Sequence, residues 1–150
     1  MRTQTEKAEA FRDMHQRDRA FIIPNPWDAG TARILAQLGF EALATTSAGF
    51  AFSLGHRDYA VGRDKVIEHV GALAAATDLP VSADLENGFG DDPKTVAETI
   101  RLAGEAGVVG EDFGEPASRQ ALIFWVEAEV PFPRERDHLR IDTAAGSTPT

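Results

Sequence analysis

Two acidic residues, Asp84 and Glu86, stand two positions apart in the segment "VSADLENGFGDDP", directly after a run with the composition of a buried strand. Alternate residues of a strand point to the same side, so we expect the two carboxylates to share one space. Carboxylates held this close repel each other unless a cation or a proton lies between them. Oxygen ligands in a chain without cysteine favour a hard divalent ion, so the pair predicts a site for Mg²⁺, with Mn²⁺ as the alternative.

Two further acids are candidate ligands of the same metal. Asp58 lies in the loop after the second predicted strand, and Glu111 lies at the end of the fourth. The competing interpretation is that such acids face water or cap helices, as most surface acids do. We prefer that interpretation for Asp91 and Asp92, because the following Pro93 marks the start of a helix.

Other groups near the predicted strand ends could bind a substrate or move protons. The segment "TTSAG" offers hydroxyl groups and backbone amides that suit a carboxylate or an oxyanion. It lacks the G-x-S-x-G spacing of a serine nucleophile. His56 lies in a loop and stays open as a general base, whereas His69 lies in a predicted helix, where a packed or solvated imidazole is expected. The segment "GFG" lacks the spacing of a phosphate loop and is flanked by acids.

The elements that must position these groups alternate between strands and helices. Buried strand runs followed by amphipathic segments are typical of an α/β protein with a parallel sheet and right-handed crossovers. In such folds the active residues lie beyond the carboxyl ends of the strands, where the candidate groups converge. Strands are predicted over residues 20–25, 41–47, 79–86 and 108–113, and helices over residues 5–17, 27–40, 63–78 and 91–107.

Composition excludes several classes of function. The chain has 150 residues, is 43% hydrophobic and carries a formal charge of −9 without a basic run, which argues against nucleic acid or an anionic membrane as partner. Cysteine is absent, which excludes disulfides and thiolate ligands. No apolar run approaches the roughly 18 residues that span a bilayer, and the N-terminus is too charged for a secretory signal. We expect a cytoplasmic protein.

The stretches "NPWDAGTARILAQLGFEALATTSAGFAFSLGHRD" and "LPVSADLENGFGDDP" resemble the isocitrate lyase / phosphoenolpyruvate mutase superfamily, close to its 2-methylisocitrate lyase-like and phosphonomutase-like branch. The resemblance runs from about Phe11 to Asp112. It implies a (β/α)₈ barrel of the TIM type and a dependence on Mg²⁺. It also implies chemistry on small 2-oxo or 2-hydroxy carboxylates, in which a C–C or P–C bond next to a pyruvyl unit is cleaved or formed through an enolate that the metal stabilises.

The resemblance also implies roles for single residues. Asp84 and Glu86 match the family's metal-holding acids on the third strand, and Asp58 matches a further acid of that metal shell, often acting through water. Glu111 aligns with the metal acid of the fourth strand once a local deletion of about three residues is allowed.

The loop of Ser47, Ala48 and Gly49 matches the segment that grips the substrate carboxylate, although the family often has Ser-Gly where this chain has Ala48. Trp27 falls where the family lines the pocket, and Asp28 where it caps the first barrel helix.

Two features depart from the family pattern. The cysteine-bearing loop of the well-defined lyases is absent, and the loop of the mutases is not recognisable, so no catalytic residue is assigned. Beyond Glu115 the resemblance ends. We therefore expect residues 1–115 to form the N-terminal half of a barrel, about four of its eight units, and residues 116–150 to form a divergent, partly disordered tail of a truncated chain.

Two functional hypotheses follow. The first is a Mg²⁺-dependent lyase or mutase that acts on a small carboxylate, with the activity of this chain left open. The second is an inert remnant that at most binds metal or self-associates through open strand edges. A flavodoxin-like binding module is disfavoured, because Trp27 and Asp28 follow the first predicted strand where a flavin phosphate would need small hydrogen-bond donors.

Overall fold

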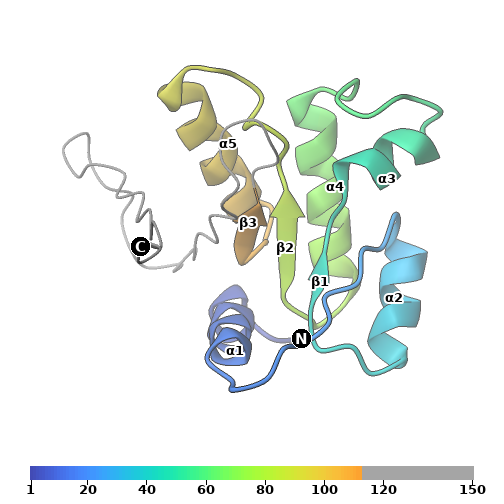
Figure 1. Ribbon diagram of the computed structural model, residues 1–150, viewed down its shortest axis with the longest axis vertical. Helices are drawn as coiled ribbons and strands as arrows, with labels where there is room; N and C mark the ends of the chain where they lie inside the picture. The colour runs from blue at the N-terminus through green and yellow to red at the C-terminus, as the bar shows by residue number, and fades with distance from the viewer. Residues whose placement is uncertain (113–150) are drawn as a thin grey trace, which may run out of the picture.

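The central feature of the structure is a small parallel sheet. The computed structural model describes residues 1–112 of the chain (Figure 1). In this part, three parallel strands lie in the order β1 (Leu43–Ala44), β2 (Val81–Asp84) and β3 (Gly110–Asp112). Leu43 pairs with Val81, and Ser82 pairs with Gly110. The chain thus has the α/β class with parallel strands that the alternating pattern predicts.

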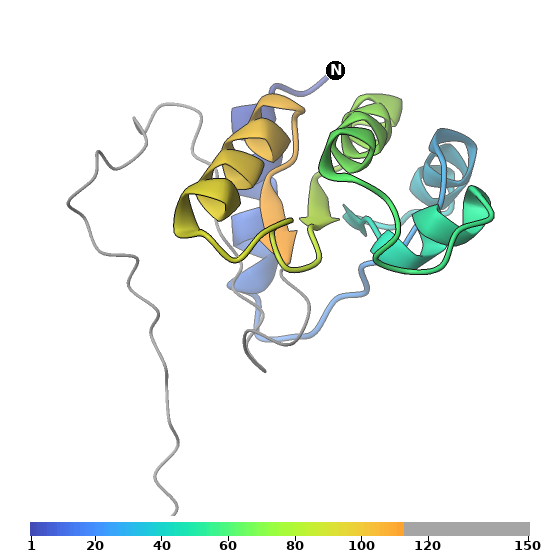
Figure 2. The same cartoon turned by 90° about the horizontal axis from the view of Figure 1, so that it is seen from above.

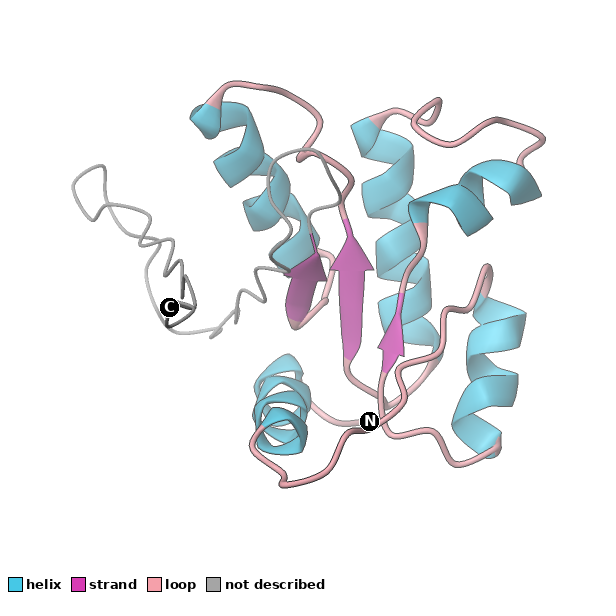
Figure 3. Ribbon diagram, in the orientation of Figure 1, coloured by secondary structure: helices cyan, strands magenta, loops and turns pink. Residues whose placement is uncertain are grey.

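Helices connect and cover the strands. Helices α2, α4 and α5 stand side by side along the outer face of the sheet, and the view from above shows them in an arc around the strands (Figure 2). The short helix α3 lies above β1, and α1 lies across the lower ends of the strands (Figure 3). The helices are α1 (Gln4–His15), α2 (Ala29–Gln37), α3 (Ser47–Ser53), α4 (Arg63–Ala76) and α5 (Pro93–Glu105).

The apolar core has two parts. The larger part lies between the sheet and the helices and includes the buried residues Leu43 and Val81 of the strands and Val70 and Leu73 of α4. Burying each of these side chains contributes about 1.5–3 kcal/mol. The second part joins α1 to the sheet through residues such as Phe11, Met14 and Val109.

Two polar side chains of α1 fasten this helix to the ends of α4 and α5. The ammonium group of the buried Lys7 donates to the carbonyl oxygens of Ala74 at 3.0 Å and Thr77 at 2.8 Å, and so satisfies the end of α4. Burial lowers the pKa of Lys7, and Asp78 partly opposes this effect. Gln4 donates to the carbonyl oxygens of Gly104 and Val108 beyond α5. Helix α1 is therefore an integral part of the fold.

Two predicted elements differ from the structure. Residues 20–25 run beside β1 but form no strand, because Pro24 and Pro26 have no N–H to donate to a ladder. One backbone bond joins the segments, from the Ala44 N–H to the Pro24 oxygen at 3.1 Å. The predicted loop after β1 is instead helix α3, which Thr46 caps by accepting from the Gly49 N–H.

The predicted helix signals are otherwise confirmed. Asp28 caps α2, because its side chain accepts from the Thr31 N–H at 2.8 Å. Gly39 ends the same helix with a φ of 90°. Asp92 holds the cap position of α5, followed by Pro93, although its side chain makes no capping hydrogen bond. The predicted tail, residues 116–150, lies outside the described residues.

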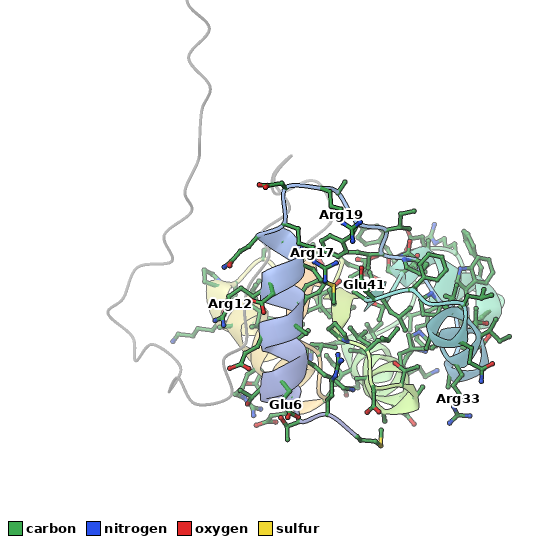
Figure 4. The ribbon with its side chains drawn as sticks, turned by 90° about the horizontal axis from the view of Figure 1, so that it is seen from below. Glu6, Arg12, Arg17, Arg19, Arg33 and Glu41 are labelled. Carbon is green, nitrogen blue, oxygen red and sulfur yellow. The ribbon has the colours of Figure 1, made fainter. Side chains whose placement is uncertain are left out.

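The lower face of the molecule carries several charged side chains. Figure 4 shows Arg17 and Glu41 pointing toward each other, and their charged groups approach to 2.7 Å. An exposed pair of this kind contributes little to stability, at most about 1 kcal/mol. In the described part of the chain, no helix has both the length and the apolar composition that a membrane crossing requires.

Candidate functional site

Asp84 ends strand β2, and hydrogen bonds to Ser47 and Thr45 hold it in place. Its Oδ2 accepts from the Ser47 N–H at 2.9 Å, which ties the first residue of α3 to the end of β2. The Asp84 N–H in turn donates to the hydroxyl group of the buried Thr45 at 2.9 Å. The end of β1, the start of α3 and the end of β2 therefore form one hydrogen-bonded unit around a carboxylate.

Glu86 is placed beside Asp84 by a turn. The strand ends at Asp84, and Glu86 has a left-handed backbone with a φ of 55°. Its N–H donates to Asp84 Oδ1 at 3.1 Å, an Asx-type turn in which the aspartate side chain stands in for a backbone acceptor. We expected the alternation of side chains along a strand to bring the two carboxylates together. That argument does not apply, because Glu86 lies beyond the end of β2. The aspartate itself creates the turn that carries the second acid.

The Glu86 side chain is buried, with an exposed fraction of 4%. None of the described side chains, those of residues 1–110, donates a hydrogen bond to its carboxylate. Burial, followed by the negative charges of Asp58 and Asp84, raises the pKa of Glu86 to about 7. A carboxylate in this position is costly in its charged form unless a proton or a cation accompanies it.

Glu86 lines a cavity of about 900 Å³. The loop before α4, the first turn of α4 and the segment from Glu86 to Phe89 form its walls. The non-glycine residues with left-handed backbones in the described part are Tyr59, Glu86 and Phe89, with φ values of 61°, 55° and 63°, and all three line this cavity. Such strained backbones gather at functional sites, because a fold retains them where a side chain must be aimed.

The four predicted metal acids are not equally placed. Asp58 is half-buried in the loop before α4, and its Oδ1 accepts from the Tyr59 N–H at 3.0 Å. Glu111 pairs with Ala83 through the β2–β3 register, and its side chain is outside the described part. Among the side chains that the structure describes, those of residues 1–110, no three acidic or histidine groups come together as a ready metal cage.

The donor set of Asp84 and Glu86 nevertheless fits Mg²⁺. This ion is commonly bound through one or two carboxylates and keeps water or substrate oxygens as its other ligands. Each oxygen of Asp84 that accepts one N–H retains a further lone pair for a cation.

The predicted carboxylate-binding loop forms the first turn of α3. The Ser47 N–H already donates to Asp84, and the Gly49 N–H donates to the Thr46 hydroxyl at 3.2 Å. The Ser47 hydroxyl and the Ala48 N–H are therefore the donors that this turn can offer to a ligand. Trp27 covers the turn, since a Cβ built on Gly49 would stand 2.5 Å from its indole Nε1.

The two histidines near the site differ in their surroundings. His56 is exposed and lines the cavity. His69 stacks on Phe50 with ring centroids 3.8 Å apart, and its Nε2 is buried without a hydrogen bond. Burial lowers the pKa of His69, and the charge of Asp28 opposes this effect. His69 is thus the packed imidazole that its helical position predicts.

One wall of the cavity was not predicted from the sequence: Arg63, Lys65 and Asn87 help to form it. The missed signal is Gly62, which holds the cap position before α4 and has no side chain to cap the first turn of the helix. Helical periodicity alone places Arg63 and Lys65 on an ordinary solvated face.

Comparisons with known proteins show which family the chain belongs to. Residues 11–130 match the family described as phosphoenolpyruvate phosphomutase. An uncharacterised protein of Mycobacterium tuberculosis is 36% identical over 128 residues, which cover 81% of this chain and 49% of that protein. The 2-methylisocitrate lyase of Halalkalibacterium halodurans is 32% identical over 108 residues, 71% of this chain and 36% of the enzyme.

A solved structure is also similar. A protein of Burkholderia cenocepacia J2315 that is assigned as a lyase/mutase is 68% identical, with a TM-score of 0.72. The match covers 73% of this chain and 40% of that protein. The chain spans about half or less of the length of the curated relatives that it matches.

Proposed function

Because this chain belongs to the phosphoenolpyruvate phosphomutase family, within the isocitrate lyase / phosphoenolpyruvate mutase superfamily, we propose that it carries the metal-binding part of a lyase or mutase active site. The proposed substrate is a small 2-oxo or 2-hydroxy carboxylate, in which a C–C or P–C bond next to a pyruvyl unit is formed or cleaved. The observation that carries this proposal is the carboxylate of the buried residue Glu86, which lies beside Asp84, lines the cavity and receives no hydrogen bond from the residues that the structure describes.

In this proposal, Asp84 and Glu86 hold a Mg²⁺ ion, or Mn²⁺ in its place, and Asp58 contributes through water. The two acids supply the negative charge that binds the cation, and the turn between them fixes their relative position. When bound, the ion would supply positive charge next to the substrate oxygen on which negative charge develops.

The remaining proposed roles belong to the rim around β1. The Ser47 hydroxyl and the Ala48 N–H hold the substrate carboxylate. Asp84 keeps this turn in place through its bond to the Ser47 N–H, and the Trp27 indole covers the turn at Gly49. Orientation of the reacting bond by such fixed donors lowers the barrier, because less reorganisation remains for the transition state.

The test is a calorimetric titration of the full chain with Mg²⁺ and then with Mn²⁺. We expect a saturable heat for the wild type that Asp84→Asn and Glu86→Gln abolish. Asp92→Asn is the matched control, since it removes an acid at the start of α5 whose side chain makes no capping bond. Absence of metal binding in a folded wild-type chain would contradict the proposal. Metal binding without turnover of any 2-oxo or 2-hydroxy acid would favour the alternative of an inert metal-binding chain.

A further inference from the structure

The turn that joins the upper end of β2 to α5 contains the dipeptide Asn87–Gly88 (Figure 1). An asparagine before glycine is the most labile context for deamidation in an unrestrained chain. The backbone nitrogen of Gly88 attacks Cγ of Asn87, the side-chain amide leaves as ammonia, and a cyclic succinimide forms. Water then opens either carbonyl group of the ring and leaves aspartate or isoaspartate at residue 87. The net reaction adds a water molecule and releases ammonia, so it requires no other reactant.

The fold depends on both residues of this dipeptide. Gly88 has a φ of 79°, and a Cβ at this position would stand 2.9 Å from Cγ2 of Val96 in α5. Glycine is the residue that adopts such a backbone without strain. Oδ1 of Asn87 accepts from the Phe89 N–H at 3.0 Å, in the Asx-type turn that asparagine and aspartate favour. The labile sequence is therefore the one that the geometry of this turn requires.

Burial does not shield the Asn87 side chain from the reaction. Asn87 is half-buried and lines the cavity beside the end of β2. The openness of this cavity to solvent gives water access to the carboxamide, and water is the second reactant. Protection must therefore come from the conformation of the turn.

Hydrogen bonds on both sides of Gly88 provide this restraint. The Gly88 N–H donates to the Leu85 carbonyl oxygen at 2.9 Å, so the proton that the attacking nitrogen must release is held and the peptide plane is fixed. The hydroxyl of the buried Thr99, in α5, donates to the Gly88 carbonyl oxygen at 2.9 Å. Rotation of the Gly88 nitrogen toward Cγ of Asn87 therefore requires the turn to detach from α5.

We propose that Asn87 is a deamidation site that the folded turn protects, and that the contact of Gly88 with Thr99 and Val96 controls its rate. Local opening of the turn exposes the dipeptide to the reaction. Aspartate at residue 87 adds a carboxylate beside Glu86, and isoaspartate adds an atom to the backbone of the turn. Refolding reverses neither product, so deamidation records each opening permanently. This inference goes beyond the proposed function and does not depend on it.

The experiment measures the rate of deamidation at Asn87 in the full chain, by peptide mapping and mass spectrometry in a mildly alkaline buffer. The chain unfolded in guanidinium chloride gives the unrestrained rate. Asn25 is the second asparagine of the chain and serves as an internal control, because the following Pro26 has no N–H and cannot take part in the same cyclisation.

The variants separate local opening from a general loss of stability. Thr99→Val removes the donor to Gly88, and Thr99→Ser keeps it. Val96→Ala removes the methyl groups that pack against Gly88, and it is the test variant if thermal melts show that Thr99→Val does not fold. Lys7→Met is the control for general destabilisation, since it removes hydrogen bonds to the C-terminal end of α4.

We expect the folded wild type to deamidate at Asn87 at least about ten times more slowly than the unfolded chain. Thr99→Val and Val96→Ala should react at least about three times faster than the folded wild type, because their turns open more often. Thr99→Ser and Lys7→Met should stay within about two-fold of the wild type, since both retain the contacts of Gly88 with α5.

Three results would refute the proposal. Equal rates in the folded and the unfolded wild type would show that the turn gives no protection. A folded test variant that reacts no faster than Lys7→Met would show that the contact with α5 does not control the rate. If Asn87 reacts no faster than Asn25 in the unfolded chain, the dipeptide is not a labile site.

Discussion

The indole of Trp27 and the backbone of Gly49 touch so closely that the site depends on the absence of a side chain at residue 49. A Cβ at that position would stand 2.5 Å from Trp27 Nε1 and 2.6 Å from Thr46 Cγ2. Contacts this short do not occur in folded proteins, so a larger residue would have to displace the indole or the cap of α3. The wall of the site and the turn beneath it are therefore coupled.

We predict that Gly49→Ala lowers the free energy of unfolding by about 1–3 kcal/mol, because the added methyl group overpacks the turn. The same change should shift the fluorescence of Trp27, measured in a Trp125→Phe background so that Trp27 is the sole reporter. Gly71→Ala is the control: its nearest neighbour would be 3.5 Å away, and alanine in a helix interior should stabilise the protein by about 0.5–1 kcal/mol. Equal effects of the two substitutions would contradict the coupling.

Glu86 should make stability depend on pH in the absence of metal. Its pKa is about 7 in the folded protein and near 4.5 when unfolded, so the folded state holds the extra proton between these values. Stability must then fall as the pH rises from about 4.5 through 7. Glu86→Gln removes this loss, and we expect it to be more stable than the wild type at pH 8 by up to about 3 kcal/mol. Urea denaturation with a chelator measures the difference, which should shrink at pH 5.

The tyrosine Tyr59 offers a direct readout of the metal, because the chain contains one tyrosine. Burial, followed by the charges of Asp58, Glu86 and Asp84, raises the pKa of Tyr59. A bound divalent cation should offset those charges, so we predict that Mg²⁺ lowers the pKa of Tyr59 in a titration followed by tyrosinate absorbance. Asp84→Asn should lower the same pKa without metal and remove the response to Mg²⁺. If saturating Mg²⁺ leaves the pKa of Tyr59 unchanged, the ion binds elsewhere than at Asp84 and Glu86.

His69 should produce the opposite pH dependence to Glu86. Burial lowers its pKa below 6.5, so the unfolded chain binds the extra proton between that folded value and 6.5. The stability present above pH 6.5 is therefore lost as the pH falls through this window. His69→Phe keeps a ring against Phe50 and removes the titration, so the stability of the variant relative to the wild type should increase on acidification. Paired melts at pH 7 and pH 5.5 measure this, since the contribution of Glu86 is common to both proteins.

Lys7 should contribute to stability far from the site. Lys7→Met keeps the apolar stem but removes the donor to the carbonyl oxygens of Ala74 and Thr77. We expect a loss of about 1–3 kcal/mol, because two acceptors at the end of α4 lose their partner. The exposed Lys94→Met should stay within about 0.5 kcal/mol of the wild type by urea denaturation. If Lys7→Met changes the stability as little as Lys94→Met, water replaces the Lys7 ammonium group as the donor to these two oxygens.

The sequence predicts most of the helices and the parallel sheet because their signals are local. Asp28 and Gly39 mark the two ends of α2 through capping chemistry that requires no distant contact. The predicted strand at residues 20–25 does not form, and the reason is also local. Pro24 and Pro26 have no N–H groups to donate to a neighbouring strand. The prediction gave more weight to the strand propensity of "AFII" than to the two prolines that follow it.

The site is less predictable, because its geometry depends on long-range contacts. The prediction that Asp84 and Glu86 belong together rests on their spacing. Their actual relation depends on the left-handed backbone of Glu86, which spacing does not reveal. The bond between Ser47 and Asp84 joins residues 37 positions apart. Such a contact appears once the crossover between β1 and β2 has placed the two strand ends together.

The segment beside β1 has a consequence for solubility. The Pro24 carbonyl oxygen accepts a hydrogen bond from the Ala44 N–H. The Asn25 side-chain amide donates to the carbonyl oxygens of Ala44 and Thr45 at 3.1 and 3.4 Å. The two prolines offer no donors of their own to an incoming strand. Natural sheets use the same combination as a gatekeeper against edge-to-edge aggregation. Replacement of both prolines would let this segment form an exposed edge strand that could pair with other chains. Its irregular backbone therefore protects the protein from aggregation.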